Sequence, residues 1–478
     1  MSGAIMKSVF NQELIIIIND STWRIVFFVL AFLIVISALN GSARNSQILE
    51  ISENLNKDEM LMQGALQDSV RKWENEPEGD PPSVTSPGVL GLSILSHYAV
   101  LPSTALRSLS TGQADVQMTY YRITAHPSLT FINDIEIKNP LNALSGSFDV
   151  AFVIIFLLPI FVIATNFDIM SKEKELGVLS LIIAHGISKT RFIIARVCAR
   201  ALLMITLILF SGLLSVVLVE SVLVSFDLWL RFILWFITVV LYSFFWFALA
   251  LFVNAWNRPS VTNGVILANL WLVFVVVLPA MVNIVATTSY PAPSRVELTT
   301  EMREATQVAD QEAAEAREDF FFDHPEMASD NVDVDQFFIQ LLATDAAVEK
   351  VIQPLLDEFQ SQSQKRQNIV NLLQYLSPAI LTQNILNDIS GTSTGRFSNF
   401  LRQVLDFHET WRDFFTKRIT AGQVMTSQDY NDIPVFYYQE VSLRYLLTSA
   451  GIPLVGLIFF ILLLSVWGTV KFRNFAIV

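Results

Sequence analysis

The sequence contains very little cysteine and little charge. Among 478 residues there is one cysteine, Cys198, and charged side chains make up 16% of the chain. A single thiol cannot form a disulfide within the chain, so any folded domain must be stabilised by burial. Soluble domains average roughly 25% charged residues, whereas this chain is 53% hydrophobic with a mean hydropathy of +0.49. The composition indicates an integral membrane protein.

The sequence also lacks a nucleotide-binding loop. The pattern G-x-x-x-x-G-K-[ST], whose backbone cradles phosphates in P-loop ATPases, does not occur. The histidines, at positions 97, 126, 185, 324 and 408, form no H-E-x-x-H motif and no pair four residues apart. We therefore expect no metal, no cofactor and no enzymatic activity in this chain.

Six apolar segments approach or reach the roughly 17 to 25 residues that a transmembrane helix needs. They are predicted at residues 24–39, 148–165, 201–224, 232–253, 264–287 and 446–470. The first is short, so it must continue past Leu39 or tilt, and residues 14–18 before it are expected to lie in the interface as an elbow. The span lacks a cleavage motif of the A-x-A kind, which favours an uncleaved anchor, but "ISALNGSA" is close enough to such a motif to keep a cleaved signal peptide as the alternative.

Basic residues in the short loops predict the orientation. Lys and Arg near the ends of spans are retained in the cytoplasm. They cluster between the second and third spans and follow the sixth, at Lys172, Lys174, Lys189, Arg191, Arg196, Arg200, Lys471 and Arg473. Both termini are therefore predicted to be cytoplasmic, in a multi-pass protein of the bacterial cytoplasmic (inner) membrane.

This orientation leaves two large regions, residues 40–147 and 288–445, outside the cytoplasm. The pattern of the first region predicts a helix over 42–73 followed by irregular chain. The second region is predicted to be mostly helical, with helices at 297–321, 336–376 and 397–418. Both regions are net acidic, which argues against nucleic acid as a partner. The predicted fold class is a mainly α membrane protein: elbow and first span at 1–39, four spans at 148–287, and the last span with its tail at 446–478.

The stretch "SKEKELGVLSLIIAHGISKTRF", residues 171–192, lies between two apolar runs. Its polar beginning ends a span, its leucines give the next turns an apolar side, and "HGIS" breaks the helix. The pattern predicts a short amphipathic helix near 168–190 on the cytoplasmic membrane surface. By itself it fits an interfacial anchor as well as a docking element.

A longer stretch carries a resemblance to a known family. The run "EKELGVLSLIIAHGISKTRFIIARV" resembles the cytoplasmic coupling helix of type-2 ABC exporter permeases, the ABCA- and ABCG-like type V class, with Val178 in place of threonine and Gly186 in place of proline. The segments "LSGSFDVAFVIIFLLPIFV", "YPAPSRVEL", "DHPEM", "LSPAILTQNILNDISGT", "FHETWRDFF" and "PVFYYQE" resemble the large-loop branch of that class, whose extra domain has no known function.

The resemblance implies a transport subunit driven by a separate cytoplasmic ABC ATPase dimer, which would bind ATP and Mg²⁺. The implied contact and packing positions are Glu173, Glu175, Gly177 and Leu179, with Lys189 and Arg191 at the rim. Six spans are few for a pathway, so a second permease chain, identical or related, is expected. Membrane lipid is expected to surround the spans and is the remaining partner.

Two functional classes stay open besides a motor-less membrane scaffold. In the first, the dimer exports an amphiphilic or peptide-like substrate, because the span centres carry no charge that ion coupling would need. In the second, the outer regions transmit ATPase-driven motion to a protein outside the membrane, and nothing crosses.

Overall fold

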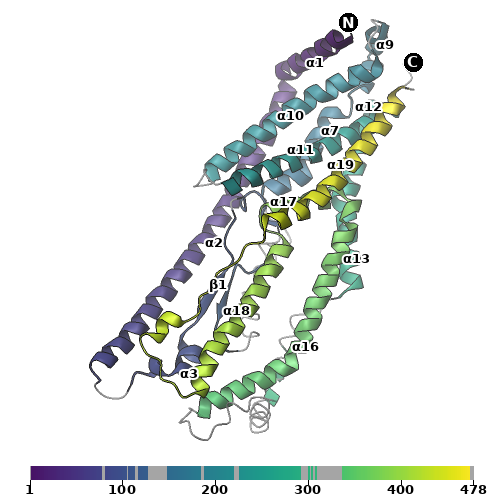
Figure 1. The fold of residues 1–478 in the computed structure, drawn as a ribbon. Coiled ribbons are helices and arrows are strands. Elements are labelled where there is room, and N and C mark those ends of the chain that lie inside the picture. The colour runs from purple at the N-terminus through teal and green to yellow at the C-terminus, as the bar shows by residue number, and fades with distance from the viewer. Residues whose placement is uncertain are drawn as a thin grey trace.

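The computed structural model describes residues 2–77, 81–104, 106–112, 117–126, 148–184, 188–219, 226–291 and 336–473, with isolated residues between 300 and 308. These ranges are mainly α-helical and form an elongated molecule (Figure 1). Both termini lie at one end, called here the terminal end, and a second, distal body lies at the other. The predicted helix at 297–321 and the "DHPEM" segment fall largely outside the described residues.

The prediction of a mainly α membrane protein with six spans is confirmed. Six helical segments are long and apolar enough to cross a membrane: Ser21–Asn75, Val150–Glu175, Lys189–Val219, Phe226–Asn254, Ser260–Ser289 and Arg444–Phe472. In Figure 1 they correspond to α2 (Ser21–Asn75), α6 to α8 (Val150–Phe152, Leu158–Asn166 and Ser171–Glu175), α10 (Lys189–Val219), α11 (Phe226–Asn254), α12 and α13 (Ser260–Trp271 and Leu278–Ser289) and α19 (Leu443–Arg473).

The first span continues far beyond its predicted end. Helix α1 (Ser2–Asn19) contains the residues predicted as an elbow, and we keep that name for it; Asp20 caps α2 by accepting a hydrogen bond from the Thr22 N–H at 2.8 Å. Helix α2 then runs 55 residues without a break. Gly41 does not end it, because the glycine makes room for a neighbour: a Cβ there would lie 1.9 Å from the carbonyl oxygen of Ser108. The predicted span and the predicted outer helix are thus one helix.

The spans differ in how much of their surface is covered. In α11 67% of the apolar window is buried, whereas in the fifth span and in α19 only 17% is. Helix α11 is therefore the centre of the membrane core, around Trp235, Tyr242 and Trp246, which are fully buried. The fifth and sixth spans leave most of their apolar surface for lipid or for a second chain.

The second and fifth spans each contain a π-helical segment before a proline. Segment η4 (Val153–Leu157) precedes Pro159, and η5 (Leu272–Val277) precedes Pro279. Because proline has no N–H, a carbonyl in the turn before it loses its helical partner. The side chains of other elements donate to carbonyls in these turns: Tyr242 to Ile155 at 3.0 Å, Trp271 to Phe156 at 3.1 Å and Ser377 to Phe274 at 2.6 Å.

The distal body draws on both of the large predicted outer regions. From the first come the outer half of α2, the short helices η1 (Ser83–Thr85), α3 (Pro87–Val89) and η2 (Leu90–Ile94), and strands β1 (His97–Val100) and β2 (Tyr120–Ile123). The strands pair antiparallel with His97 opposite Ile123. The second supplies α16 (Gln336–Leu373), η7 (Gln374–Leu376), α17 (Pro378–Ile389), α18 (Thr394–Thr420) and η8 (Asp429–Asp432).

The two regions share one hydrophobic core rather than two. Leu90, Ala99 and Ile123 from the first region pack in one cluster with Phe400 and Trp411 from the second. The sequence predicts two separate domains here, because more than a hundred residues of spans separate the regions in the chain. Their sharing of a core means that neither region buries its apolar surface without the other.

The location of the distal body outside the cytoplasm is a prediction that cysteine labelling checks. Ser83 and Ser361 are exposed in the distal body. In a Cys198→Ser background, cysteines at either position are expected to react with an impermeant maleimide in cells whose outer barrier is permeabilised. Protection of both until the inner membrane is lysed would mean the opposite orientation.

Candidate functional site

The predicted amphipathic helix near 168–190 is two short helices at the terminal end. Helix α8 (Ser171–Glu175) follows the second span after a turn, and α9 (Val178–Ala184) begins after Gly177. Gly177 has φ +72°, and no atom lies within 4 Å of a Cβ built there. Its requirement for glycine is therefore conformational. Residues 185–187, including His185 and Gly186, lie outside the described residues.

Glu173 belongs to a buried group of charges that we call the ionic cluster: Glu13, Asp168, Glu173, Arg196 and Arg200. Arg196 lies 2.5 Å from Glu173 and 2.9 Å from Glu13. Arg200 lies 2.8 Å from Glu13 and 3.9 Å from Asp168, and it also donates to the carbonyl of Thr165. The side chains of Glu13, Arg196 and Arg200 are each at most 11% exposed. The cluster joins α8 to the elbow α1 and to the span α10.

Uncharged side chains join α8 to two further spans. Asn263 of α12 donates to the Ser171 hydroxyl at 2.9 Å, and this hydroxyl donates to the Asn254 side chain of α11 at 3.4 Å. Asn254 in turn donates to the carbonyl of Asn166, at the end of α7, at 3.0 Å. All four residues are buried. Buried amides left unpaired are costly, so this small network holds α8 against α11 and α12 in one register.

Glu175 has a structural partner as well. Its Oε1 accepts a hydrogen bond from the backbone N–H of Ser260, the first residue of α12, at 2.7 Å. A carboxylate at this position accepts a hydrogen bond from an otherwise unpaired backbone N–H, and the positive end of the helix dipole stabilises its negative charge. Beside it, Lys174 donates to the Asn257 side chain at 3.0 Å. The acidic residues predicted as docking contacts thus fasten α8 to spans three and five.

The exposed side of α8 and α9 carries three large apolar side chains. Leu176, Val178 and Leu181 are 67%, 44% and 64% exposed, and they surround Gly177. We call these four residues the coupling face. Leu179, also predicted as a coupling residue, is only 1% exposed and packs with Met170, Ile193 and Phe472. Its position is that of a core residue supporting the face from behind.

Lys189 and Arg191 begin α10, after the residues that are not described. Lys189 is partly buried and Arg191 is exposed. The structure therefore brings Glu173, Glu175, Gly177 and Leu179 into one short segment and puts the two basic residues on the next helix. Sequence reasoning used Arg196 and Arg200 only for orientation and missed Glu13. The signal was a single carboxylate directly before the apolar run "LIIII": Glu13 is itself only 5% exposed, and a buried carboxylate needs a cationic partner.

A second connection links the spans to the distal body through α17. At its start, Ser377 donates to the carbonyl of Phe274 in η5, and at its end Arg231 of α11 donates to the carbonyl of Ile389 at 2.7 Å. Arg231 is also paired with Asp227 at 2.7 Å. Helix α17 packs in the same cluster as the spans, whereas α18, which follows it, packs in the core of the distal body.

The distal body also brings two histidines together. His408 bonds the carbonyl of His126 at 2.7 Å, and His126 lies 3.2 Å from Asp345. The hydrogen bond to Asp345 raises the pKa of His126, and burial lowers the pKa of His408. Within the described ranges, no three His, Cys, Asp or Glu side chains are grouped so as to hold a metal ion.

The sequence "GTSTG", residues 391–395, matches the G-x-S-x-G pattern of α/β-hydrolases. That pattern needs a serine on a sharp turn between a strand and a helix. Here Ser393 follows the helix α17, and its hydroxyl accepts a hydrogen bond from the Arg396 N–H at 3.4 Å as the cap of α18. The serine has a capping role in this context.

A family model described as "Domain of unknown function (DUF3526)" matches residues 295–439. This range lies within the second predicted outer region and covers less than half of the chain. No curated protein matches the sequence.

Proposed function

We propose that this chain is the membrane-spanning permease subunit of an ABC exporter, and that a separate ATPase docks on the coupling face. The observation that carries the proposal is the two-sided character of α8 and α9. One side is exposed and apolar at Leu176, Val178 and Leu181, while the other is bonded to α10, α11 and α12 and, through Arg196, to the elbow. The resemblance of residues 173–197 to a coupling helix supports the same assignment.

The bonds of α8 would convert a displacement of the coupling face into movement of spans. Glu173 is bonded to α10 through Arg196, and Glu175 and Ser171 to α12. Packed interfaces of this kind move as rigid bodies rather than deforming continuously. Closure of an ATPase dimer below the face would therefore tilt α10, α11 and α12 together with α8, since Ser171 is also bonded to Asn254 of α11.

A second permease chain completes the proposed assembly. The fifth and sixth spans have 17% of their apolar windows buried, far less than α11. An isologous contact along one of these faces would give twelve spans around a common axis. Since no charge lies at the span centres in the sequence, an amphiphilic or peptide-like molecule is the substrate class that we propose.

The expected assembly is two permease chains and two ATPase chains. Purification of the tagged chain with its co-expressed genomic neighbours, followed by native mass spectrometry, measures it. A lone permease chain that still supports full coupled ATP hydrolysis would contradict the dimer. Absence of any ATPase under these conditions would instead favour the motor-less scaffold.

Mechanical transmission to an external protein is the second candidate, and α17 is the observation that favours it. This helix is bonded to the fifth span by Ser377 and to the fourth by Arg231, and it leads directly into α18 of the distal body. Motion of these two spans would therefore displace the distal body whether or not a substrate crosses.

Spin labels in the distal body test this transmission. With Asn54→Cys on α2 and Ser361→Cys on α16, in a Cys198→Ser background, ATP is expected to change the label separation in the assembled complex. Arg231→Gln removes the donor to the Ile389 carbonyl, so we expect the distance change to disappear while ATP hydrolysis persists. Arg402→Gln, an exposed arginine on α18, is the matched control. A distance change that survives Arg231→Gln would exclude the bond between Arg231 and the Ile389 carbonyl as the connection.

A further inference from the structure

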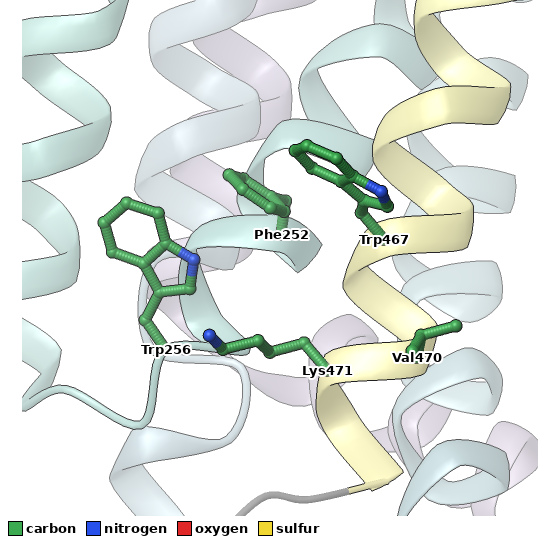
Figure 2. A pocket seen from close by; sticks show the side chains of 5 residues that line it. All are labelled: Phe252, Trp256, Trp467, Val470 and Lys471. Carbon is green, nitrogen blue, oxygen red and sulfur yellow. The ribbon is translucent and has the colours of Figure 1, made fainter.

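A pocket lined by aromatic side chains lies where the ends of α11 and α19 meet, at the terminal end of the spans (Figure 2). It has a volume of about 420 Å³ and is lined by Phe252, Trp256, Trp467, Val470 and Lys471. None of these residues belongs to the coupling face or to the ionic cluster. The pocket therefore calls for a separate explanation.

Three aromatic rings form one continuous wall. Phe252 stacks on Trp467 with the ring centroids 6.2 Å apart, and it meets Trp256 edge to face at 5.5 Å. The wall is fixed by close helix packing, since a Cβ built at Gly468 would lie 3.4 Å from the backbone of Phe252. Trp256 is nonetheless 44% exposed and Trp467 62% exposed. Tryptophan is enriched at membrane interfaces, where its ring faces acyl chains and its N–H faces water.

One cation borders this wall. Figure 2 shows the Lys471 side chain crossing the open side of the pocket beneath Phe252, with its ammonium group pointing toward Trp256. Lys471 is exposed, and it forms no ion pair with any residue that the structure describes. Arg258, also exposed, follows Trp256 by two residues. An apolar wall with positive charge at the end of two spans matches a molecule with a hydrocarbon chain and an anionic head.

We propose that this pocket binds one anionic phospholipid. Its acyl chain lies against Phe252 and Trp467, and its phosphate is bound by the ammonium group of Lys471. Basic pockets between transmembrane helices are known sites for anionic headgroups. Assignment to the inner leaflet rests on the proposed orientation, but the binding itself does not. A second copy of this chain on the same face would have to bury Lys471 without a partner, which is costly unless that copy supplies an acid.

The test counts lipids retained by the full-length chain. The detergent-purified protein is mixed with dioleoylphosphatidylglycerol or dioleoylphosphatidylcholine and examined by native mass spectrometry. We expect tighter binding of one phosphatidylglycerol than of phosphatidylcholine, and a loss of about fivefold in its affinity in Lys471→Gln, since one cation near an anionic lipid surface contributes a modest amount. Trp467→Ala is expected to weaken retention of both lipids.

Two matched variants control for general effects. Lys7→Gln removes an exposed charge from α1, and Phe459→Ala removes an aromatic ring that is 60% exposed on α19 outside the pocket. Neither is expected to change retention. Equal binding of the two lipids, or wild-type retention by both Lys471→Gln and Trp467→Ala, would overturn the proposal. So would a disulfide between two copies carrying Val470→Cys in a Cys198→Ser background, because it would show that a second chain covers the pocket.

Discussion

Replacing Leu181 by arginine is expected to detach the ATPase from the permease while leaving the permease folded. The side chain is 64% exposed, so the substitution disturbs little within the chain. In the complex it would put a charge where a leucine is buried. Loss of a buried leucine costs about 1.5 to 3 kcal/mol, and the unpaired charge adds to that. We expect at least a roughly tenfold drop in the ATPase retained when tagged permease is purified from membranes.

Leu61→Arg is the matched control, because Leu61 is 61% exposed on α2, two residues before Gln63, which donates to the carbonyl of Tyr430 in the distal body. It should retain the ATPase at the wild-type level. Full retention by Leu181→Arg, at normal permease abundance, would mean that α8 and α9 only anchor the loop to the membrane surface.

The structure changes which variants are informative at this site. Glu175→Arg would weaken docking if Glu175 touched the ATPase, but it also removes the acceptor for the Ser260 N–H at the start of α12. Gly177→Leu would put a residue with a side chain at a φ of +72°, which only glycine adopts easily, and would strain the backbone between α8 and α9. If either of these variants lost the ATPase, the loss could come from a missing contact or from a disturbed fold. Loss of the ATPase by Leu181→Arg would have only the first explanation.

Replacing Glu13 by alanine is expected to produce the largest loss of stability in the terminal half of the protein. Glu13 accepts from Arg196 at 2.9 Å and from Arg200 at 2.8 Å, and its side chain is 6% exposed. Removing one member of a buried ionic group leaves its partners uncompensated, at a cost of about 3 to 5 kcal/mol. The measurement is thermal unfolding of the detergent-solubilised chain, followed through the loss of monodisperse protein.

Two further variants separate this effect from a general loss of charge. Glu13→Gln keeps one oxygen acceptor and should lose less stability than alanine. Glu53→Ala removes an exposed carboxylate from α2 and should lose almost none. Equal unfolding temperatures for Glu13→Ala and the wild type would show that the ionic cluster contributes nothing net.

The membrane core was predictable because each span is encoded locally. A run of apolar residues such as 232–253 needs no knowledge of its neighbours to be identified as a helix that crosses a bilayer. The length of α2 was not predictable in the same way. The polarity of its outer half resembles that of a separate soluble helix, and only the fit of Ser108 against Gly41 explains why no break is needed.

The candidate site was predictable in position but not in its contacts. The spacing of Glu175 and Gly177 indicated a short helix in the right loop, yet the partners of its acidic residues are far away in sequence. Glu13 is 183 residues from Arg196. Ser260 is 85 residues from Glu175. Pairings of this range depend on how spans pack side by side, which periodicity in one segment cannot show. Sharing of one core by the two outer regions was missed for the same reason.

The unbroken α2 has a geometric consequence for movement in the distal body. Its part beyond the membrane is about 50 Å long at 1.5 Å per residue. A continuous helix behaves as a stiff rod, so a tilt of about 5° where it leaves the bilayer displaces its tip by about 4 Å. The elbow α1, tied to the coupling helices through Glu13 and Arg196, adjoins the start of the same continuous helix at Ser21, on the other side of the membrane core. Small changes in the angle of α2 beside the ionic cluster would thus displace the opposite end of the molecule by about the distance between two atoms in contact.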